Sequence, residues 1–362
     1  MRESSAADPA QAIWVILAED YGMKVTEVAR LPIGQGTVNY RVTWRGHRYF
    51  VKHYPHETDL DAEARAIELT NTAARYGVPT PTLVRTREDQ VLSRHGIAAV
   101  SVWEWIDGHT ITGGFTSAQQ EAAGEALGRI HRAFAAHPDS AKPSPELDAW
   151  LHPDLAGIET TIEDLLNRIA QRGHRDDFDH TAEQTLTERR HALRRVPALL
   201  DGLPTLTTQV LHGDYSAVNL LFNADHLTAV TDFRPPVPFL IAYELGRIAF
   251  DPRTVVLDED WITSASRLVG SYLRTNTTVR GDDVRACARV ALLQLLTSLY
   301  GVKQHYRKPG LLQKDLDDFW LLRHRASTRL LRHLDQAEAA LEVIIRHEGE
   351  NPATPPPNGG AS

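Results

Sequence analysis

Three oxygen-bearing side chains fall within one short stretch, residues 210–233, which reads VLHGDYSAVNLLFNADHLTAVTDF. Asn219 begins a strand-like run, a turn follows at residues 223–226, and Asp232 comes directly after the returning run. The predicted hairpin therefore places Asn219 beside Asp232, with Asp214 on the loop just before it. Each residue alone is typical of a turn or a cap, but together they form a hard-oxygen set that suits Mg²⁺. Because Mg²⁺ fills most of its positions with water and phosphate oxygens, the pattern predicts a nucleotide-phosphate site.

The N-terminal part of the sequence supplies the groups that such a site needs. The spacing D-x-x-x-x-N followed by D-F is that of the protein-kinase active site, in which the first Asp orients the acceptor hydroxyl. Gly34 and Gly36 lie in a turn between two strand-like runs, where backbone N–H groups are able to approach phosphate, and Lys52 lies on the next strand. We interpret Glu63, in the helix that follows, as the ion-pair partner of Lys52, with Glu68 as the alternative.

Residues 25–255 resemble the aminoglycoside phosphotransferase and choline kinase-like family, small-molecule kinases with a protein-kinase-like fold. The segment LHGDYSAVNLLF (211–222) is similar to the family's HGD-x-x-x-x-N catalytic loop, and VTDF (230–233) is similar to its metal-binding motif. The further segments that match the family's pattern, in order, are GVPTP (77–81), WEWIDG (103–108), LGRIH (127–131) and YELG (243–246).

The resemblance implies a role for each candidate residue. Asp214 would be the catalytic base or hydroxyl-orienting group, and Asn219 and Asp232 would be the Mg²⁺ ligands. His212 would support the catalytic loop rather than act as a base. The residues implied in binding ATP are Gly34, Gly36, Lys52 and Glu63 at the phosphates, and the main chain at Glu104 and Ile106 near the purine.

One segment departs from the family's pattern. After Asp232 and Phe233 the family often has Gly or an acidic residue, whereas this chain continues with Arg234, Pro235 and Pro236. Arg234 either anchors this proline-fixed loop or contacts phosphate or an anionic acceptor. The departure leaves a second metal site and the substrate class open.

The pattern of strands and helices expected around these residues predicts an α+β, protein-kinase-like fold with two lobes, the first small and β-rich and the second larger and mostly helical. Alternating runs at 38–44 and 47–54 flank the turn Arg45-Gly46, which is typical of a hairpin. From Ser117 onward the 3.6-residue period dominates and includes one long predicted helix over residues 316–347. The predicted organisation is a disordered N-terminus (1–11), a nucleotide-binding lobe (12–105), a helical lobe with the catalytic hairpin and the acceptor pocket (106–346), and a disordered tail (347–362).

Composition narrows the setting. A single cysteine, Cys287, excludes an internal disulfide and suits a reducing cytoplasm. The net charge of −8 argues against a nucleic-acid partner, and no apolar run predicts a membrane helix or a secretory signal. The oligomeric state is not predicted.

The function that these features favour is ATP-dependent transfer of the γ-phosphate to a hydroxyl of a small molecule, such as an aminoglycoside or another antibiotic. A metabolite kinase that uses an amino alcohol, homoserine or a sugar is the alternative within the same fold. The alternative from another class is a non-catalytic nucleotide-binding regulator, whose usual mark is the loss of one of the residues named above.

Overall fold

The computed structural model describes residues 9–32, 37–95, 98–310 and 312–350. The chain divides into two compact units: unit 1 consists of residues 1–110 and 219–236, and unit 2 of residues 111–218 and 237–362. Unit 1 contains an antiparallel sheet and unit 2 is mostly helical, which confirms the predicted α+β class. Within the described ranges, no helix is long and apolar enough to cross a membrane.

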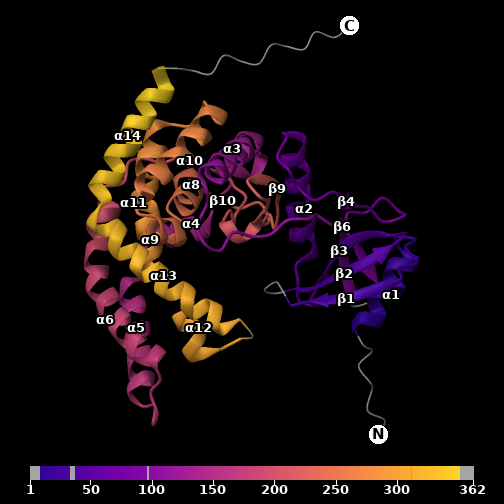
Figure 1. The fold of residues 1–362 in the computed structure, drawn as a ribbon, viewed down its shortest axis with the longest axis horizontal. Helices are drawn as coiled ribbons and strands as arrows, with labels where there is room; N and C mark the ends of the chain where they lie inside the picture. Colours follow the sequence, from indigo (N-terminus) through magenta and orange to yellow (C-terminus); the bar gives the residue numbers. More distant parts are fainter. Residues whose placement is uncertain (1–8, 33–36, 96–97, 311, 351–362) are drawn as a thin grey trace. The chain divides into compact units, whose positions relative to one another are not determined.

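A six-stranded antiparallel sheet forms the body of unit 1 (Figure 1). Its strand order is β1-β2-β3-β6-β4, and β5 also pairs with β6. The strands are β1 (Glu27–Leu31), β2 (Val38–Trp44), β3 (His47–Tyr54), β4 (Leu83–Val84), β5 (Ser93–His95) and β6 (Ala98–Glu104). The predicted hairpin of β2 and β3 turns at Arg45 and Gly46, which both have positive φ, 50° and 79°. A two-residue hairpin turn of type I′, whose twist matches that of the flanking strands, requires positive φ at both of its central residues.

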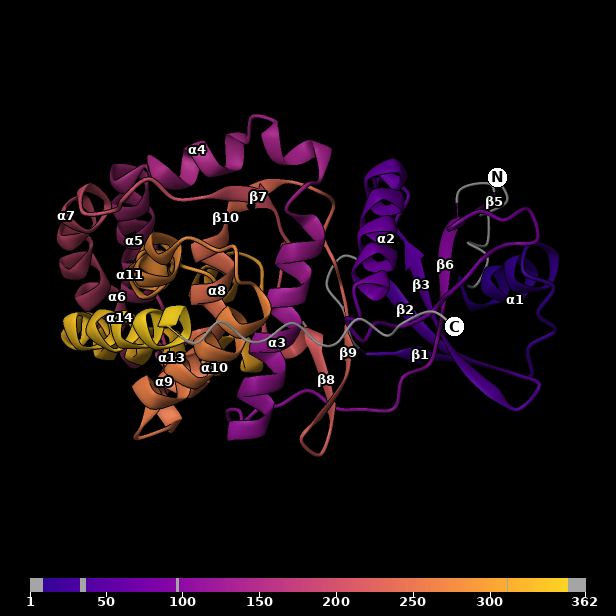
Figure 2. The same cartoon turned by 90° about the horizontal axis from the view of Figure 1, so that it is seen from above.

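Two helices cover opposite faces of this sheet, as Figures 1 and 2 both show: α1 (Pro9–Glu19) and α2 (Leu60–Arg75). Successive side chains of a strand point to opposite faces. Val51 therefore joins the hydrophobic core with Ile13 and Leu17 of α1, and the next residue, Lys52, points to the face of α2. The alternation along β3 thus separates the core of unit 1 from its polar face.

The hairpin of β8 (Leu220–Asn223) and β9 (His226–Val230) also belongs to unit 1. The Val230 N–H donates to the Pro79 carbonyl at 2.7 Å, and His109 and Phe222 exchange two backbone hydrogen bonds of 3.0 and 2.9 Å. The predicted boundary groups this hairpin with the helical residues 106–346. The structure groups it with the sheet because these hydrogen bonds join it to residues far away in the sequence.

Unit 2 consists of helices and one short two-stranded sheet, β7 (Thr208–Val210) with β10 (Pro238–Leu240). Its α-helices are α3 (Ser117–Phe134), α4 (Pro145–Leu151), α5 (Leu155–Ala170), α6 (Asp177–Ala192), α7 (Val196–Asp201), α8 (Ile241–Ala249), α9 (Pro252–Leu257), α10 (Trp261–Thr275), α11 (Gly281–Thr297), α12 (Val302–Arg307), α13 (Gln313–Arg332) and α14 (Leu334–Glu350). Short 3₁₀ helices lie at Pro138–Ala141, Leu193–Arg195 and, across the boundary of the two units, Ala217–Asn219.

Glycines allow helices of unit 2 to pack closely. A Cβ added at Gly124 on α3 would meet the backbone of Leu268 on α10, and one added at Gly246 on α8 would meet the carbonyl oxygen of Cys287 on α11. Because Glu244 of α8 accepts hydrogen bonds from the N–H groups of His212 and Gly213, the contact of α8 with α11 helps to fix the loop that contains them.

Some predicted element bounds differ from the structure. The helix predicted over 316–347 is two helices, because the backbone leaves the helical conformation at His333, with φ −116° and ψ 19°. No Gly or Pro marks that break in the sequence. The segments predicted to be disordered, 1–11 and 347–362, overlap α1 and α14 at residues 9–11 and 347–350, and their other residues lie outside the described ranges.

Candidate active site

Lys52 lies between two carboxylates in unit 1. Its Nζ is 3.1 Å from Oδ1 of Asp232 and 3.7 Å from Oε2 of Glu63, and it lies over the ring of Tyr54. The Lys52 and Glu63 side chains are about one-fifth exposed, so solvent screens the ion pair only in part. Two anionic neighbours fix the direction of the ammonium group on the α2 side of the sheet.

Glu68, the alternative partner for Lys52, lies elsewhere. Its carboxylate is 3.8 Å from the Arg85 guanidinium, and both side chains are largely exposed. Glu63 is in the first turn of α2, which begins after the cap residue Asp59. The geometry therefore brings together Lys52 and Glu63, the pair that the sequence analysis favoured.

Asn219 and Asp232 flank the open end of the β8–β9 hairpin. The backbone carbonyl of Asn219 accepts hydrogen bonds from the N–H and the hydroxyl of Thr231, at 2.9 and 3.2 Å, so Asp232 follows directly after the paired residue. Asp232 has a φ of +63°, a left-handed conformation that Asp adopts more readily than most residues. Its second oxygen is 3.7 Å from the guanidinium of Arg234, which is half exposed.

The other nucleotide-binding predictions fall on backbone groups. The Glu104 N–H donates to the Thr82 carbonyl at 2.9 Å, and the Trp105 N–H donates to the Arg48 carbonyl at 3.2 Å. Glu104 and Trp105 also line a hollow of about 360 Å³ with residues 46–49. Ile106 follows them at the end of this segment. Gly34 and Gly36 lie outside the described residues.

Asp214 lies in unit 2, on the loop after β7. Its N–H donates to Nδ1 of His212 at 3.1 Å, and its Oδ1 is 2.6 Å from a guanidinium nitrogen of Arg247 on α8. His212 is fully buried, which agrees with a supporting role for its ring. Although burial opposes it, the charge of Asp214 raises the pKa of Arg247, so the arginine stays protonated beside the carboxylate.

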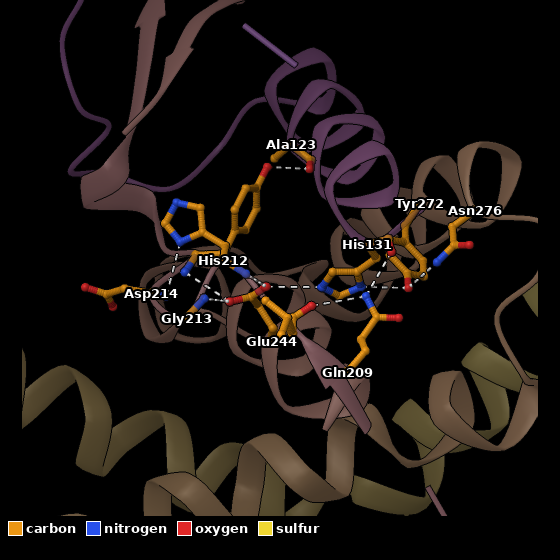
Figure 3. Close-up of polar contacts among 11 residues, drawn as sticks. Ala123, His131, Gln209, His212, Gly213, Asp214, Glu244, Tyr272 and Asn276 are labelled. Atoms are coloured by element: carbon orange, nitrogen blue, oxygen red, sulfur yellow. Dashed lines mark hydrogen bonds and ion pairs between the residues drawn. The ribbon is translucent and has the colours of Figure 1, made fainter. Parts of the chain in front are cut away.

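A buried carboxylate, that of Glu244, supports the loop that carries Asp214 (Figure 3). Glu244 is 2% exposed, and its two oxygens accept the N–H groups of Gly213 at 2.8 Å and His212 at 3.1 Å. The Tyr215 N–H is 3.5 Å away. These bonds fix the backbone on both sides of Asp214, so its carboxylate is presented from a rigid support.

Glu244 continues into a polar chain within the helical core (Figure 3). Nε2 of His131 donates to its Oε2 at 3.1 Å, and Nδ1 of His131 is 2.9 Å from the Tyr272 hydroxyl. Asn276 donates to the same hydroxyl at 2.9 Å. Burial alone would raise the pKa of Glu244, but the hydrogen bond and charge of His131, and further hydrogen bonding from Gly213, hold that pKa below its ordinary value.

A sequence profile of the phosphotransferase enzyme family matches residues 27–281 of the chain. The chain belongs to this family. It is therefore an enzyme, a phosphotransferase, and the predicted class of small-molecule kinases that act on alcohol groups is confirmed at the level of the family. No curated protein sequence matched the phosphotransferase.

Solved structures show the same fold at low sequence identity. Spectinomycin phosphotransferase, solved with ADP and spectinomycin, is 13% identical with a TM-score of 0.64, over 90% of this chain and 99% of that one. The aminoglycoside phosphotransferase from Alicyclobacillus acidocaldarius is 15% identical with a TM-score of 0.60, over 95% and 98%. A microcompartment-associated aminopropanol kinase is 15% identical with a TM-score of 0.56, over 91% and 99%.

The donor set of the phosphotransferase fits Mg²⁺ rather than a softer metal. Asn219 and Asp232 offer an amide and a carboxylate oxygen at one end of the hairpin. Across the described ranges, no three His, Cys, Asp or Glu side chains are grouped so that they alone would hold a metal ion. Such a pair suits an ion whose remaining ligands are water and phosphate oxygens.

Three side chains near the Asp214 loop of the phosphotransferase make contacts that the sequence did not predict. His131 and Glu244 lie in LGRIH (127–131) and YELG (243–246), segments that match the family's pattern but in which these side chains were assigned no role, and Arg247 follows directly after the second. The available signal was a charged residue inside the apolar run IAYELGRIAF, since Glu is almost never fully buried without partners. That pattern indicates that Glu244 is buried with polar partners, but it does not predict which residues those partners are.

Proposed function

We propose that the chain transfers the γ-phosphoryl group of ATP to a hydroxyl of a small molecule. The observation that carries this proposal is the position of Lys52 between Glu63 and Asp232, together with the rigid loop that presents Asp214. A lysine so oriented suits the α- and β-phosphates, and a carboxylate held through its own backbone suits an acceptor hydroxyl.

Each residue has a defined task in the proposed reaction. The bond between the γ-phosphorus and the bridging oxygen of ATP breaks, the acceptor oxygen bonds to phosphorus, its proton passes to Asp214, and ADP leaves. Lys52 offsets phosphate charge, and the main chain at Glu104 and Ile106 receives the purine. Asn219 and Asp232 would hold Mg²⁺, which would neutralise further phosphate charge.

The proposed setting is the cytoplasm, where ATP is abundant and the buried thiol of Cys287 stays reduced. Spectinomycin was bound in one of the similar structures and is an acceptor of that protein; it is not part of the function proposed for this chain. Lys52, Asp214, Asn219 and Asp232 are all present, so no observation favours a non-catalytic regulator.

ADP release with and without a panel of hydroxylated acceptors tests the proposal, with mass spectrometry of the acceptor to detect the added phosphate. We expect release that depends on the acceptor and a fall in kcat of about 10²–10⁴-fold in Asp214→Ala, with ATP binding retained. Normal turnover in that variant, or ATP binding without any turnover, would contradict the proposal.

A further inference from the structure

Two arginines of unit 2, on α8 and on the next helix, α9, have acidic partners. Arg247 pairs with Asp214. Arg253, at the start of α9, has a guanidinium nitrogen 3.5 Å from the carboxylate of Asp251. In each of these two pairs the charges offset one another. The two carboxylates are therefore already paired, and a further buried cation beside them needs another partner.

Arg323 on α13 is such a cation. It is 8% exposed, and its Nε and Nη2 are buried without a hydrogen-bond partner among the residues that the structure describes. Its guanidinium carbon lies 5.8 Å from the ring centre of Phe319, over which Arg253 also lies, at 5.0 Å. Burial and the neighbouring charge of Arg247 lower the pKa of Arg323 to about 10, although Tyr243 and the Asp251 carboxylate, which is already paired with Arg253, oppose this, so Arg323 remains protonated at neutral pH.

A second buried arginine, Arg189, shows what a structural role looks like. It is 1% exposed, and its guanidinium donates to the carbonyls of Leu295, Leu296 and Ser298 and to the Ser327 hydroxyl. Those carbonyls end α11, where a helix carries partial negative charge. Arg323 has no comparable set, and a buried charge without a partner is destabilising.

Arg323 also lies near two residues of α8, Tyr243 and Arg247, the second of which pairs with Asp214. Burial raises the pKa of Tyr243 on α8, the charges of Arg247 and Arg323 oppose that rise, and the charge of Asp214 adds to it, so all three charged groups lie near enough to act on this hydroxyl. Tyr243 in turn packs edge-on against Phe239 and Trp150, with ring centres 4.7 and 5.8 Å away. The three rings are partly exposed, which gives an aromatic surface next to a buried positive charge.

We propose that Arg323 binds an anionic group of the phosphoryl acceptor, so that the acceptor is a hydroxylated carboxylate or phosphate monoester and not a cationic aminoglycoside. This inference rests on the proposed kinase function. Two parallel N–H groups of a guanidinium match the two oxygens of such an anion. The anion compensates the buried charge, the aromatic surface carries the body of the acceptor, and its hydroxyl reaches Asp214.

Thermal unfolding of the full chain tests the role of Arg323 without knowledge of the acceptor. If Arg323 serves a ligand, Arg323→Met removes an uncompensated charge, and Tm should rise by a few degrees. Arg189→Met is the matched control and should lower Tm, because it leaves the carbonyls at the end of α11 without a donor. The exposed Arg325→Met on the same helix should leave Tm unchanged. A fall in Tm for Arg323→Met would overturn the proposal.

Acceptor selectivity provides the second test. ADP release is measured with hydroxy acids, with their primary amides, and with phosphate monoesters of the corresponding diols. We expect kcat/KM for the better anion to exceed that for the amide by about 10–100-fold, and the two anionic series identify which anion binds. Arg323→Gln should remove this preference by raising KM for the anionic acceptor alone, whereas Arg325→Gln should keep it.

The outcomes separate the two proposals. Equal use of the acids and the amides, or a preference for amine-bearing acceptors, would refute the anion-binding role while leaving the kinase function intact. Failure of the kinase function itself would appear as no ADP release with acceptors of any charge, and Asp214→Ala would then change nothing.

Discussion

Replacement of Glu244 by Gln should detach the loop that carries Asp214 while nearly preserving the side-chain volume. In the structure, Oε1 accepts from Gly213, and Oε2 accepts from both His212 and His131. A glutamine keeps one oxygen and places an NH₂ group where the other was. In either orientation that NH₂ group faces a buried N–H donor, so at least one charged hydrogen bond becomes a donor–donor contact.

The magnitude follows from these contacts. A hydrogen bond to a charged group contributes about 1.5–3 kcal/mol, and a buried donor left without a partner costs about 1–3 kcal/mol. We therefore expect Glu244→Gln to lower the free energy of unfolding by about 3 kcal/mol. Turnover should fall by about 10²-fold because Asp214 is displaced, whereas KM for ATP should change little, since Lys52 and Asp232 lie in unit 1.

Chemical denaturation and acceptor-dependent ADP release measure the two effects. Glu125→Gln on the exposed face of α3 is the control and should change stability by less than about 0.5 kcal/mol. The pKa of Glu244 is lower in the folded chain than its ordinary value of 4.5. The stabilisation of the fold by the ionised Glu244 is therefore complete above pH 4.5 and is lost as the pH falls through the lower pKa of the folded chain. The difference in free energy of unfolding between the wild type and Glu244→Gln should therefore shrink on acidification. A loss below about 1 kcal/mol with unchanged kcat would refute the reasoning.

Three further predictions concern other parts of the chain. Lys52→Met should lower kcat/KM for ATP by about 10²-fold and Glu63→Gln by less, measured by ADP release; equal effects would contradict a supporting role for Glu63. Gly246→Ala should lower the free energy of unfolding by about 3 kcal/mol, because its Cβ meets the α11 backbone, while Gly113→Ala, which has open space, should not. Cys287 is buried and its thiol pKa is raised by burial, so thiol reagents should label it only after unfolding; rapid labelling of the native chain would argue against its burial.

Local patterns in the sequence were sufficient to predict where the residues proposed to bind phosphate lie. The turn Arg45-Gly46 fixes the register of β2 and β3, and strand alternation then decides that Lys52 and the core residue Val51 face opposite sides. The β8–β9 hairpin is equally local, so its open end brings Asn219 next to the strand that precedes Asp232. Hairpin register depends on nearby residues, which explains why these positions were predictable.

Non-local partners could not be predicted in the same way. His131 and Glu244 meet across 113 residues, and no periodicity specifies which buried polar groups share a hydrogen bond. The hydrogen bond from the β8–β9 hairpin to Pro79, 151 residues before Val230, is a similar case. The break at His333 has no Gly or Pro to announce it, so helical spacing alone predicts a continuous helix.

The discontinuity of unit 1 in the sequence has a consequence for synthesis on the ribosome. The six-stranded sheet is complete once residue 104 has emerged, but the hairpin that bonds to Pro79 and the carboxylate that meets Lys52 come much later, Asp232 being 180 residues beyond Lys52. At about 5–20 residues per second, that gap lasts roughly 10–35 s. During this interval the carbonyl of Pro79 and the backbone of His109 lack the hydrogen-bond partners that Val230 and Phe222 supply in the folded chain, and a chain that terminates before residue 222 supplies neither.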